Sequence, residues 1–429
     1  MSYEILVLII SFVFLLGIGV PVAWSIGISC LLTLMIAVDP VAGYTTIAQR
    51  MATGLDSFSL LAIPLFILAG QIMNQGGIAN RLIAFAKALM GSLPGGLIYV
   101  NVVTAMLFGA ISGSAVAATS AIGGVLGPHM EKENYSKEFG AAINITSSTT
   151  GLIIPPSNVL IVYSLASGGV SVAALFLAGY IPGILLGLGM MIMAAFWIKK
   201  KKYPRGERSS TKRVLTTFID ALPSLMLLVI VIGGIVAGIF TATEASGIAV
   251  LYALILSFIY REIKPSGLSK IFLDSVCTSA IVMLLIATSM SMSWVMSFEE
   301  IPQTISQSLV ALSDNKFVIL MIINLILLFV GTFMDITPAV LIFTPIFLPV
   351  VTSLGIDPIH FGIMMVINLC VGLCTPPVGS VLFIGVGVAK TSVQKVLKPL
   401  IPLYAVMVLV LILVTAVPAI SMWLPSLFD

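Results

Sequence analysis

Long apolar runs recur through nearly the whole chain, and they limit its fold more than any other feature. The stretch Ile319–Val330 (ILMIINLILLFV) is apolar on nearly every side, and only 9% of the 429 residues are charged, against about 25% in soluble domains. A soluble globule is therefore excluded. A membrane β-barrel is excluded because its strands alternate apolar and polar residues. The chain is predicted to be an all-α polytopic membrane protein, since each spanning helix needs about 20 apolar residues.

The apolar runs divide into two groups of spans around one polar stretch. The first group covers approximately residues 4–18, 22–38, 57–75, 82–107, 109–128, 139–170 and 173–198. The second covers approximately 218–240, 243–260, 271–297, 316–334, 336–354, 358–389 and 395–424. The first run has no Lys or Arg before it and no cleavage pattern after it. It is interpreted as a retained span, not as a signal peptide.

Several function classes find no support in the sequence. The four cysteines, at positions 30, 277, 370 and 374, have no CxxC spacing, and only His129 and His360 are available to complement them, so no zinc site or disulfide framework is predicted. The basic residues lie in loops, which argues against nucleic acid as a partner. No Walker loop, HExxH or GxSxG motif occurs, so neither ATP-driven pumping nor an enzyme is indicated.

The two groups of spans resemble each other. The two Pro-Pro pairs, Pro155-Pro156 and Pro376-Pro377, lie 221 residues apart in the similar contexts GLIIPPSNVLIVYS and GLCTPPVGSVLFIG. Nearly the same offset relates Gly17 to Gly238, Ser25 to Ser246, Gly109 to Gly331, and Pro182 to Pro402. An internal repeat is therefore predicted, and internal repeats are typical of secondary transporters.

The polar stretch between the halves indicates their orientation. Residues 199–213 hold eight basic residues and one acid, whereas both ends of the chain lack basic residues. Because Lys and Arg gather in cytoplasmic loops, the stretch is predicted to be cytoplasmic and both termini periplasmic. The sequence thus predicts a first inverted repeat over 1–198, a cytoplasmic basic linker over 199–213, and a second inverted repeat over 214–429, in a bacterial inner membrane.

Each half contains an apolar helix that its own residues should break. The segment Asn144–Asn158 (NITSSTTGLIIPPSN) combines hydroxyls, Gly151 and two prolines, and Asn368–Ser380 (NLCVGLCTPPVGS) is its twin. Proline and glycine interrupt a helix and leave carbonyl groups for water, protein or an ion to satisfy. A plain packing kink is the alternative. The duplication favours a pair of broken helices.

A second unusual segment precedes each broken helix. Phe108–Gly124 (FGAISGSAVAATSAIGG) and Val330–Pro345 (VGTFMDITPAVLIFTP) are interpreted as re-entrant hairpins. Short side chains at a hairpin tip present carbonyl and hydroxyl oxygens, which suit an alkali cation such as sodium. The N-terminal ends of half-helices favour a substrate carboxylate, and their C-terminal ends favour the cation.

Asp335 is the most informative single residue. Only Asp335 and Asp357 carry charge between Phe317 and Ala389, and a carboxylate at membrane depth is costly unless a ligand, water or partner relieves it. It is predicted to hold a ligand or to gate the site, and the alternative is a helix cap. The acids at positions 56, 244 and 274 are interpreted as caps or loop contacts, and Asp220 as structural.

These segments together resemble the large membrane subunit (DctM/SiaM type) of tripartite ATP-independent periplasmic (TRAP) transporters, over the whole chain. The resemblance is carried by SFSLLAIPLFILAGQIM at 57–73, FGAISGSAVAATSAIG at 108–123, TGLIIPPSN at 150–158, GGIVAGIFTATEASGIAVLYA at 233–253, GTFMDITPA at 331–339 and GLCTPPVGSVLF at 372–383. The family more often has proline where this chain has Ala242. Within the family, the sequence is most similar to the large subunit of sialic acid transporters.

The resemblance implies a sodium-coupled importer of an organic anion that works as an elevator. It implies that the chain is inactive without a small four-helix membrane subunit and a periplasmic substrate-binding protein. Two or more sodium ions are implied, and no organic cofactor. One sodium site would be formed by the hairpin residues Gly109, Ser112 and Gly113 together with Ser147 and Gly151 of the broken helix. The second would be formed by Gly331, Thr332 and Asp335 together with Gly372 and Thr375. The substrate, taken as sialic acid, would contact Ser114, Ser157, Asn158, Asp335 and Thr337.

Three other readings stay open at this point. A self-sufficient sodium/dicarboxylate symporter of the same superfamily would need neither partner subunit. An intramembrane hydrolase would need a second aspartate or a base beside Asp335, and the sequence offers none that is evident. A channel is disfavoured because broken helices in inverted halves are typical of alternating access.

Overall fold

The computed structural model describes residues 3–201, 203, 205–206, 209–313 and 315–428. The predicted repeats and linker include residues 1–2, 202, 204, 207–208, 314 and 429, which lie outside the described residues. The first half contains α1 (Tyr3–Gly17), α2 (Val22–Ala37), α3 (Pro40–Leu55), η1 (Phe58–Leu61), α4 (Ala62–Gln75), α5 (Ile78–Met90), α6 (Gly96–Ser112), α7 (Ala115–Lys132), α8 (Lys137–Ser148), η2 (Thr149–Leu152), α9 (Asn158–Ala166) and α10 (Val172–Lys201).

The second half continues the all-helical fold. It contains α11 (Thr211–Val236), α12 (Ala242–Ile259), α13 (Pro265–Phe298), α14 (Ile301–Leu312), α15 (Lys316–Gly331), α16 (Ile336–Ser353), α17 (Pro358–Leu373), α18 (Ser380–Val388), α19 (Val393–Ala416), α20 (Ala419–Met422) and η3 (Pro425–Leu427). The predicted all-α membrane fold is confirmed.

Among the described residues, seven helical segments are long and apolar enough to cross a membrane. They are Phe58–Gln75, Val172–Lys201, Thr211–Val236, Ala242–Ile259, Pro265–Phe298, Ile336–Ser353 and Val393–Ala416. Five further apolar helices are shorter: α1, α2, α6, α15 and α17. These five helices have 15 to 17 residues, at or below the minimum of about 17 residues that spans a bilayer.

The predicted spans differ from the helices in three places. The single span predicted over 82–107 is wrong, because α5 ends at Met90 and α6 begins at Gly96. The intervening Gly-Ser-Leu-Pro-Gly sequence interrupts the helix despite its apolar flanks. The helix α3 was not predicted as a span; Asp39 caps it by accepting a hydrogen bond from Val41 N. The helix α14, which begins just before Pro302, was also missed.

The helices of the second half repeat the spacing of the first. The helix α7 begins at Ala115 and α16 at Ile336, 221 residues later, and the starts of α8 and α17 are separated by the same interval. So are the starts of α10 and α19. This interval equals the separation of the two Pro-Pro pairs. The order of helices therefore follows the sequence similarity; the orientation of the halves in a membrane stays a prediction.

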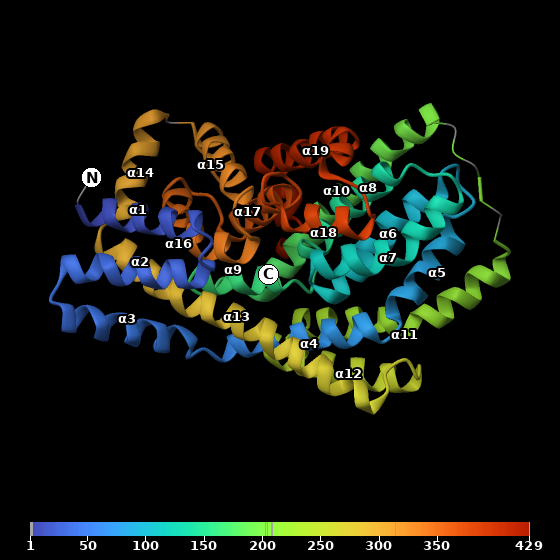
Figure 1. Ribbon diagram of the computed structural model, residues 1–429, viewed down its shortest axis with the longest axis horizontal. Coiled ribbons are helices and arrows are strands. Elements are labelled where there is room, and N and C mark those ends of the chain that lie inside the picture. Colours follow the sequence, from blue (N-terminus) through green and yellow to red (C-terminus); the bar gives the residue numbers. More distant parts are fainter. Residues whose placement is uncertain (1–2, 202, 204, 207–208, 314, 429) are drawn as a thin grey trace.

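The helices form two groups that differ in position (Figure 1). Along the lower edge and left side of the view, α1–α4 and α11–α13 pack on one another; here they are called the frame helices. Above them, α6–α10 and α15–α19 form a second group, called the cavity helices. The helix α5 joins the groups in the first half by contacting both α11 and α6.

The middle of the cavity helices is formed by the two broken helices. The eight residues of α8 after its first turn, 141–148, are all buried, and α17 is buried over most of its length. Cys370 of α17 lies with its Sγ 3.7 Å from the Thr149 carbonyl oxygen, and Cys374 Sγ lies 3.7 Å from the Ile145 carbonyl oxygen. The small Cys side chains allow the two helices to approach closely.

Candidate functional site

A cavity of about 220 Å³ lies between the frame helices and the cavity helices. It has room for several water molecules or a small polar solute, since a water occupies about 30 Å³ in the liquid. Its polar lining residues are Gln71, Ser112, Ser114, Asn158, Thr278, Asp335, Thr337 and Ser380. The apolar lining includes Ile63, Ile67, Val159, Val282, Leu373 and Val381. Both groups of helices thus contribute to one site.

Four helix N-termini converge on this cavity. Its lining includes Ser114 before α7, Asn158 at the start of α9, Asp335 before α16, and Ser380 at the start of α18. The first N–H groups of a helix have no partner inside the helix, and they carry the positive end of its dipole. Four such ends bring partial positive charges to the cavity. No Lys or Arg is among the lining residues, and Asp335 is the one charged residue there.

Asp335 stands at the N-cap position of α16 but makes no side-chain capping hydrogen bond. Proline occupies the third helical position, Pro338, and therefore offers no N–H for the usual cap. Instead, Ser380 Oγ donates a hydrogen bond of 3.3 Å to Asp335 Oδ1. This contact joins the start of α16 to the start of α18. The carboxyl group of Asp335 also lines the cavity.

The first hairpin tip has a different polar arrangement. Ser114 caps α7, since its hydroxyl oxygen accepts a hydrogen bond of 3.2 Å from Ala117 N. Gly113 allows the sharp turn between α6 and α7 by adopting a φ of +61°. Ser157 is fully buried and donates to the Leu152 carbonyl oxygen at 2.6 Å. Ser157 is therefore not among the cavity-lining residues, whereas Asn158, the next residue, is.

Two of the residues predicted for the first sodium site, Gly109 and Gly151, meet where α6 crosses η2. A Cβ built on Gly109 would stand 2.6 Å from Gly151 Cα, so the two backbones touch. Ser147 Oγ donates to Asn101 Oδ1 at 3.0 Å, and Asn101 Nδ2 donates to Asn144 Oδ1 at 3.3 Å. The structure thus brings Gly109 and Gly151 together, while Ser147 bonds to Asn101 on α6, and Ser112 and Gly113 line the cavity.

The residues predicted for the second sodium site form a similar crossing. A Cβ built on Gly372 would stand 2.6 Å from Gly331 C. Thr332 Oγ1 donates to Phe329 O, and Thr375 Oγ1 donates to Val371 O, each at 2.7 Å. A hydroxyl that donates its proton in this way keeps lone pairs that can face a cation. Asp335 was predicted both for the second sodium site and for the substrate site. It follows this crossing in the chain and lines the cavity.

Three polar lining residues were not predicted from the sequence. Gln71 comes from α4 and Thr278 from α13, both frame helices, while Ser380 comes from α18. The only signal for Gln71 and Thr278 is a polar residue within an apolar helix, and many such residues occur. The frame also approaches the hairpin closely: a Cβ built on Gly70 would stand 2.8 Å from Ser112 O.

Comparison with known proteins identifies the family of this chain. Residues 9–420 match the family described as the tripartite ATP-independent periplasmic transporter, DctM component. The chain belongs to this family. The predicted TRAP large-subunit assignment is therefore confirmed, and the DctM family is a family of membrane transport proteins.

Curated relatives of this chain have different substrates in their names. The chain is 57% identical to the Salmonella typhimurium protein YgiK over 426 residues, covering 99% of this chain and 98% of YgiK. It is 41% identical to the isethionate TRAP transporter permease protein DctMQ of Oleidesulfovibrio alaskensis, covering 96% of this chain and 65% of DctMQ. It is 36% identical to the sialic acid TRAP transporter large permease protein SiaM of Vibrio cholerae, covering 96% of each.

A solved structure supports the fold. The YdaH transporter of Alcanivorax borkumensis, whose crystal structure is described as revealing an unusual topology, is 13% identical, with a TM-score of 0.65 over 88% of each chain. At this identity the similarity concerns the fold alone. The particular similarity to sialic acid transporters predicted from the sequence is not confirmed, since the isethionate permease has the higher identity of the two.

Proposed function

We propose that this TRAP large permease subunit is a sodium-coupled secondary importer that moves an organic anion across the bacterial inner membrane. The observation that carries the proposal is the cavity on which four helix N-termini converge. Such ends attract anions through their free N–H groups and their dipoles. A substrate carboxylate would be bound by these ends, in the region of Ser114, Asn158 and Thr337.

Sodium would occupy the two glycine crossings. At each crossing the backbones come close enough to leave carbonyl oxygens near one another, and the hydroxyls of Ser147, Thr332 and Thr375 already donate their protons elsewhere. Their oxygens are then available as acceptors, the hard ligands that alkali cations prefer. Asp335 would add a full negative charge next to the second crossing and so link the cation to the anion.

Sodium coupling supplies enough free energy for import. Each sodium ion that enters down a tenfold gradient contributes about 1.4 kcal/mol, and one net positive charge gains about 2.3 kcal/mol per 100 mV. Two sodium ions with one monoanion would therefore supply roughly 5 kcal/mol, equivalent to an ideal accumulation of several thousand-fold. A third ion would raise this limit.

The proposed substrate is a hydroxyl-rich organic anion, with sialic acid as the first compound to test. Hydroxyl and amide groups around the cavity, including Gln71, Asn158 and Thr278, would pair with substrate hydroxyls. A site that hydrogen-bonds a substrate hydroxyl discriminates strongly against an analogue without it. The relative SiaM is named for sialic acid and DctMQ for isethionate, so an isethionate-like sulfonate is the second compound to test.

The proposed partners are a small four-helix membrane subunit and a periplasmic substrate-binding protein. Since this chain covers 65% of DctMQ, about a third of that relative has no counterpart here. A separate small subunit would supply that part. Import by rigid movement of the cavity helices against the frame helices, as an elevator, agrees with the two groups of helices.

The test is uptake of labelled sialic acid into proteoliposomes that hold this chain and its small subunit. Sodium and the binding protein are each added or omitted. Uptake that requires both supports the whole proposal. Uptake with sodium alone would favour a self-sufficient symporter, the alternative function. The same series with isethionate and a C4-dicarboxylate distinguishes a wrong substrate from a wrong mechanism, because an active transporter would respond to one of them.

A further inference from the structure

The helix α5 is the covalent link between the frame helices and the first hairpin. It begins after Gly77, which has a φ of +70°, and ends before Gly91. Five residues, 91–95, then connect it to α6, whose far end forms the hairpin tip at the cavity. The helix α5 packs on α11 of the frame and on α6. Its attachment therefore decides where any movement of the hairpin can begin.

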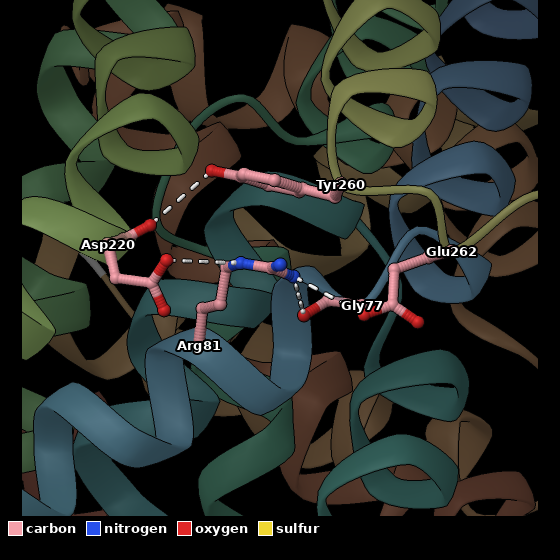
Figure 2. Close-up of polar contacts among 5 residues, drawn as sticks. All are labelled: Gly77, Arg81, Asp220, Tyr260 and Glu262. Atoms are coloured by element: carbon pink, nitrogen blue, oxygen red, sulfur yellow. Dashed lines mark hydrogen bonds and ion pairs between the residues drawn. The ribbon is translucent and has the colours of Figure 1, made fainter.

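Arg81 of α5 is held by several groups at once (Figure 2). Its guanidinium lies 3.5 Å from the ring centroid of Tyr260, its Nε lies 3.6 Å from Asp220 Oδ1, and its Nη1 lies 3.7 Å from Glu262 Oε1. Nη1 also donates to the Gly77 carbonyl oxygen at 3.2 Å. Asp220 belongs to α11, Tyr260 and Glu262 follow the end of α12, and Gly77 directly precedes α5. We call the five residues the Arg81 cluster.

The geometry of the cluster fixes the side chain of Arg81. That side chain is only 18% exposed, although the two carboxylates are 59% and 45% exposed. Exposed ion pairs contribute little by themselves. A planar guanidinium that stacks on an aromatic ring and forks between two carboxylates is held in one orientation. Tyr260 closes the cluster, since its hydroxyl donates to the Asp220 carbonyl oxygen at 3.4 Å.

Two neighbouring contacts bind the same helix to the frame. The rings of Phe85 and Phe218 have centroids 5.5 Å apart and join α5 to α11. A Cβ built on Gly77 would stand 2.7 Å from Glu262 Cγ, so the start of α5 rests directly on that side chain. Polar and apolar contacts therefore attach both the first and the middle turns of α5 to the frame helices.

The corresponding helix of the second half is attached differently. The helix α14 occupies the equivalent place in the helix order, but its sequence IPQTISQSLVAL contains no charged residue. Its main neighbour is α16, a cavity helix, whereas α5 packs on α11 of the frame. The two connecting helices are thus unequal, and the Arg81 cluster belongs to the first half.

We infer that Arg81 is a positioning residue that keeps α5 fixed to α11 and α12 during transport, so that the hairpin α6–α7 moves by bending at residues 91–95. The inference rests on the proposed function, because it concerns movement of the cavity helices. Gly91 and Gly95 flank the bend, and glycine absorbs large changes of φ and ψ at low steric cost. The contact between α5 and α11 stays intact through the cycle.

The first test joins α5 to α11 covalently. The double variant Phe85→Cys and Phe218→Cys, in a Cys277→Ser background, is linked with a short bifunctional maleimide in the full transporter. Uptake is expected to stay within about twofold of the unlinked double variant, because the two helices do not separate. A fall of about tenfold or more on linking, absent from either single variant, would overturn the inference.

A second linked pair gives the opposite expectation. The variants Gln71→Cys on α4 and Val116→Cys on α7 place one thiol on the frame and one on the hairpin, both at the cavity wall. Linking them is expected to reduce uptake at least about tenfold relative to either singly labelled variant. Uptake that survives this link would show that the hairpin does not move relative to the frame, and it too would overturn the inference.

The second test removes the cluster. Arg81→Gln is compared with Lys87→Gln, an exposed position on the same helix, by amide hydrogen exchange over residues 78–90 and by uptake. Arg81→Gln is expected to speed hydrogen exchange about tenfold and to slow uptake. Arg81→Lys is expected to give rates between those of Arg81→Gln and the wild type. Lys87→Gln is expected to change neither exchange nor uptake. Unchanged exchange, or faster exchange with normal uptake, would contradict the positioning role. Hydrogen exchange can be measured in a protein that does not transport. A failure of the positioning role can therefore be distinguished from a failure of the proposed function.

Discussion

At the scale of single residues, the position of Asp335 explains why a carboxylate is tolerated deep in an apolar chain. It stands at a helix start without a side-chain capping hydrogen bond, and Ser380 at the start of another broken helix donates to it. A carboxylate between two helix N-termini is stabilised by both dipoles. This placement leaves the charge available to the cavity, as a ligand or gate requires.

We predict that Asp335→Asn lowers sodium-dependent uptake by about tenfold or more, equivalent to at least about 1.4 kcal/mol. The amide keeps the size of the side chain but removes the charge that would face the cation. Initial uptake rates at several sodium concentrations measure this effect, and the sodium dependence should weaken together with the rate.

The matched control is Asp357→Asn in the same half of the chain. Asp357 caps α17 by accepting a hydrogen bond of 2.7 Å from Ile359 N, and it does not line the cavity. Its replacement should leave the sodium dependence of uptake unchanged. If Asp335→Asn behaves in the same way, the assignment of Asp335 to the site is wrong.

At the scale of helices, the glycine crossings decide how closely the hairpins approach the broken helices. Gly109 meets Gly151, and Gly331 meets Gly372, with no room for a Cβ between the backbones. Around the first crossing, Asn144 Nδ2 also donates to the Thr119 carbonyl oxygen at 2.8 Å. Small residues bring helices together and polar groups hold their register, which is the usual way in which helices associate in membranes.

We predict that Gly109→Ala destabilises the protein by about 1–3 kcal/mol, the usual cost of overpacking, and lowers uptake. The added methyl group would stand 2.6 Å from Gly151 Cα, so the backbone of α6 or η2 must shift. Gly124→Ala on α7 is the control, because a Cβ there has nothing within 4 Å. Thermal unfolding of the two variants in detergent provides the comparison; equal midpoints would contradict the close crossing.

At the scale of the whole molecule, two groups of helices enclose a site that neither completes alone. The cavity takes its helix N-termini from the cavity helices and takes Gln71 and Thr278 from the frame helices. The basic residues 199–201 and 212–213 lie at the facing ends of α10 and α11. By the positive-inside rule, these ends are predicted to be cytoplasmic.

We predict that a cysteine at Ser426 reacts with an impermeant maleimide in intact spheroplasts, whereas one at Thr211 does not. Both positions are exposed in the structure, so the membrane alone should separate them. Lysed membranes should allow both to react. The reverse pattern would place the C-terminus in the cytoplasm and invert the proposed topology.

The sequence by itself determined the all-helical fold, the repeat and the two breaks in each half, because these depend on local properties. Apolar length, Pro-Pro pairs and glycine act within a few residues of one another. The same reasoning joined α5 and α6 into one span across Gly91, and it missed α3 and α14. It predicted both Ser157 and Asn158 as substrate contacts; Asn158 lines the cavity, whereas Ser157 does not.

Only the tertiary structure decided which polar residues share the cavity and what fixes α5. Ser380 lies 45 positions from Asp335, and Asp220 and Glu262 are far from Arg81 in the chain. No spacing rule links such residues, because their contacts arise from helix packing. Gln71 and Thr278 face the same space for that reason. A sequence indicates that a residue is polar within an apolar helix; the packing of the other helices decides what it faces.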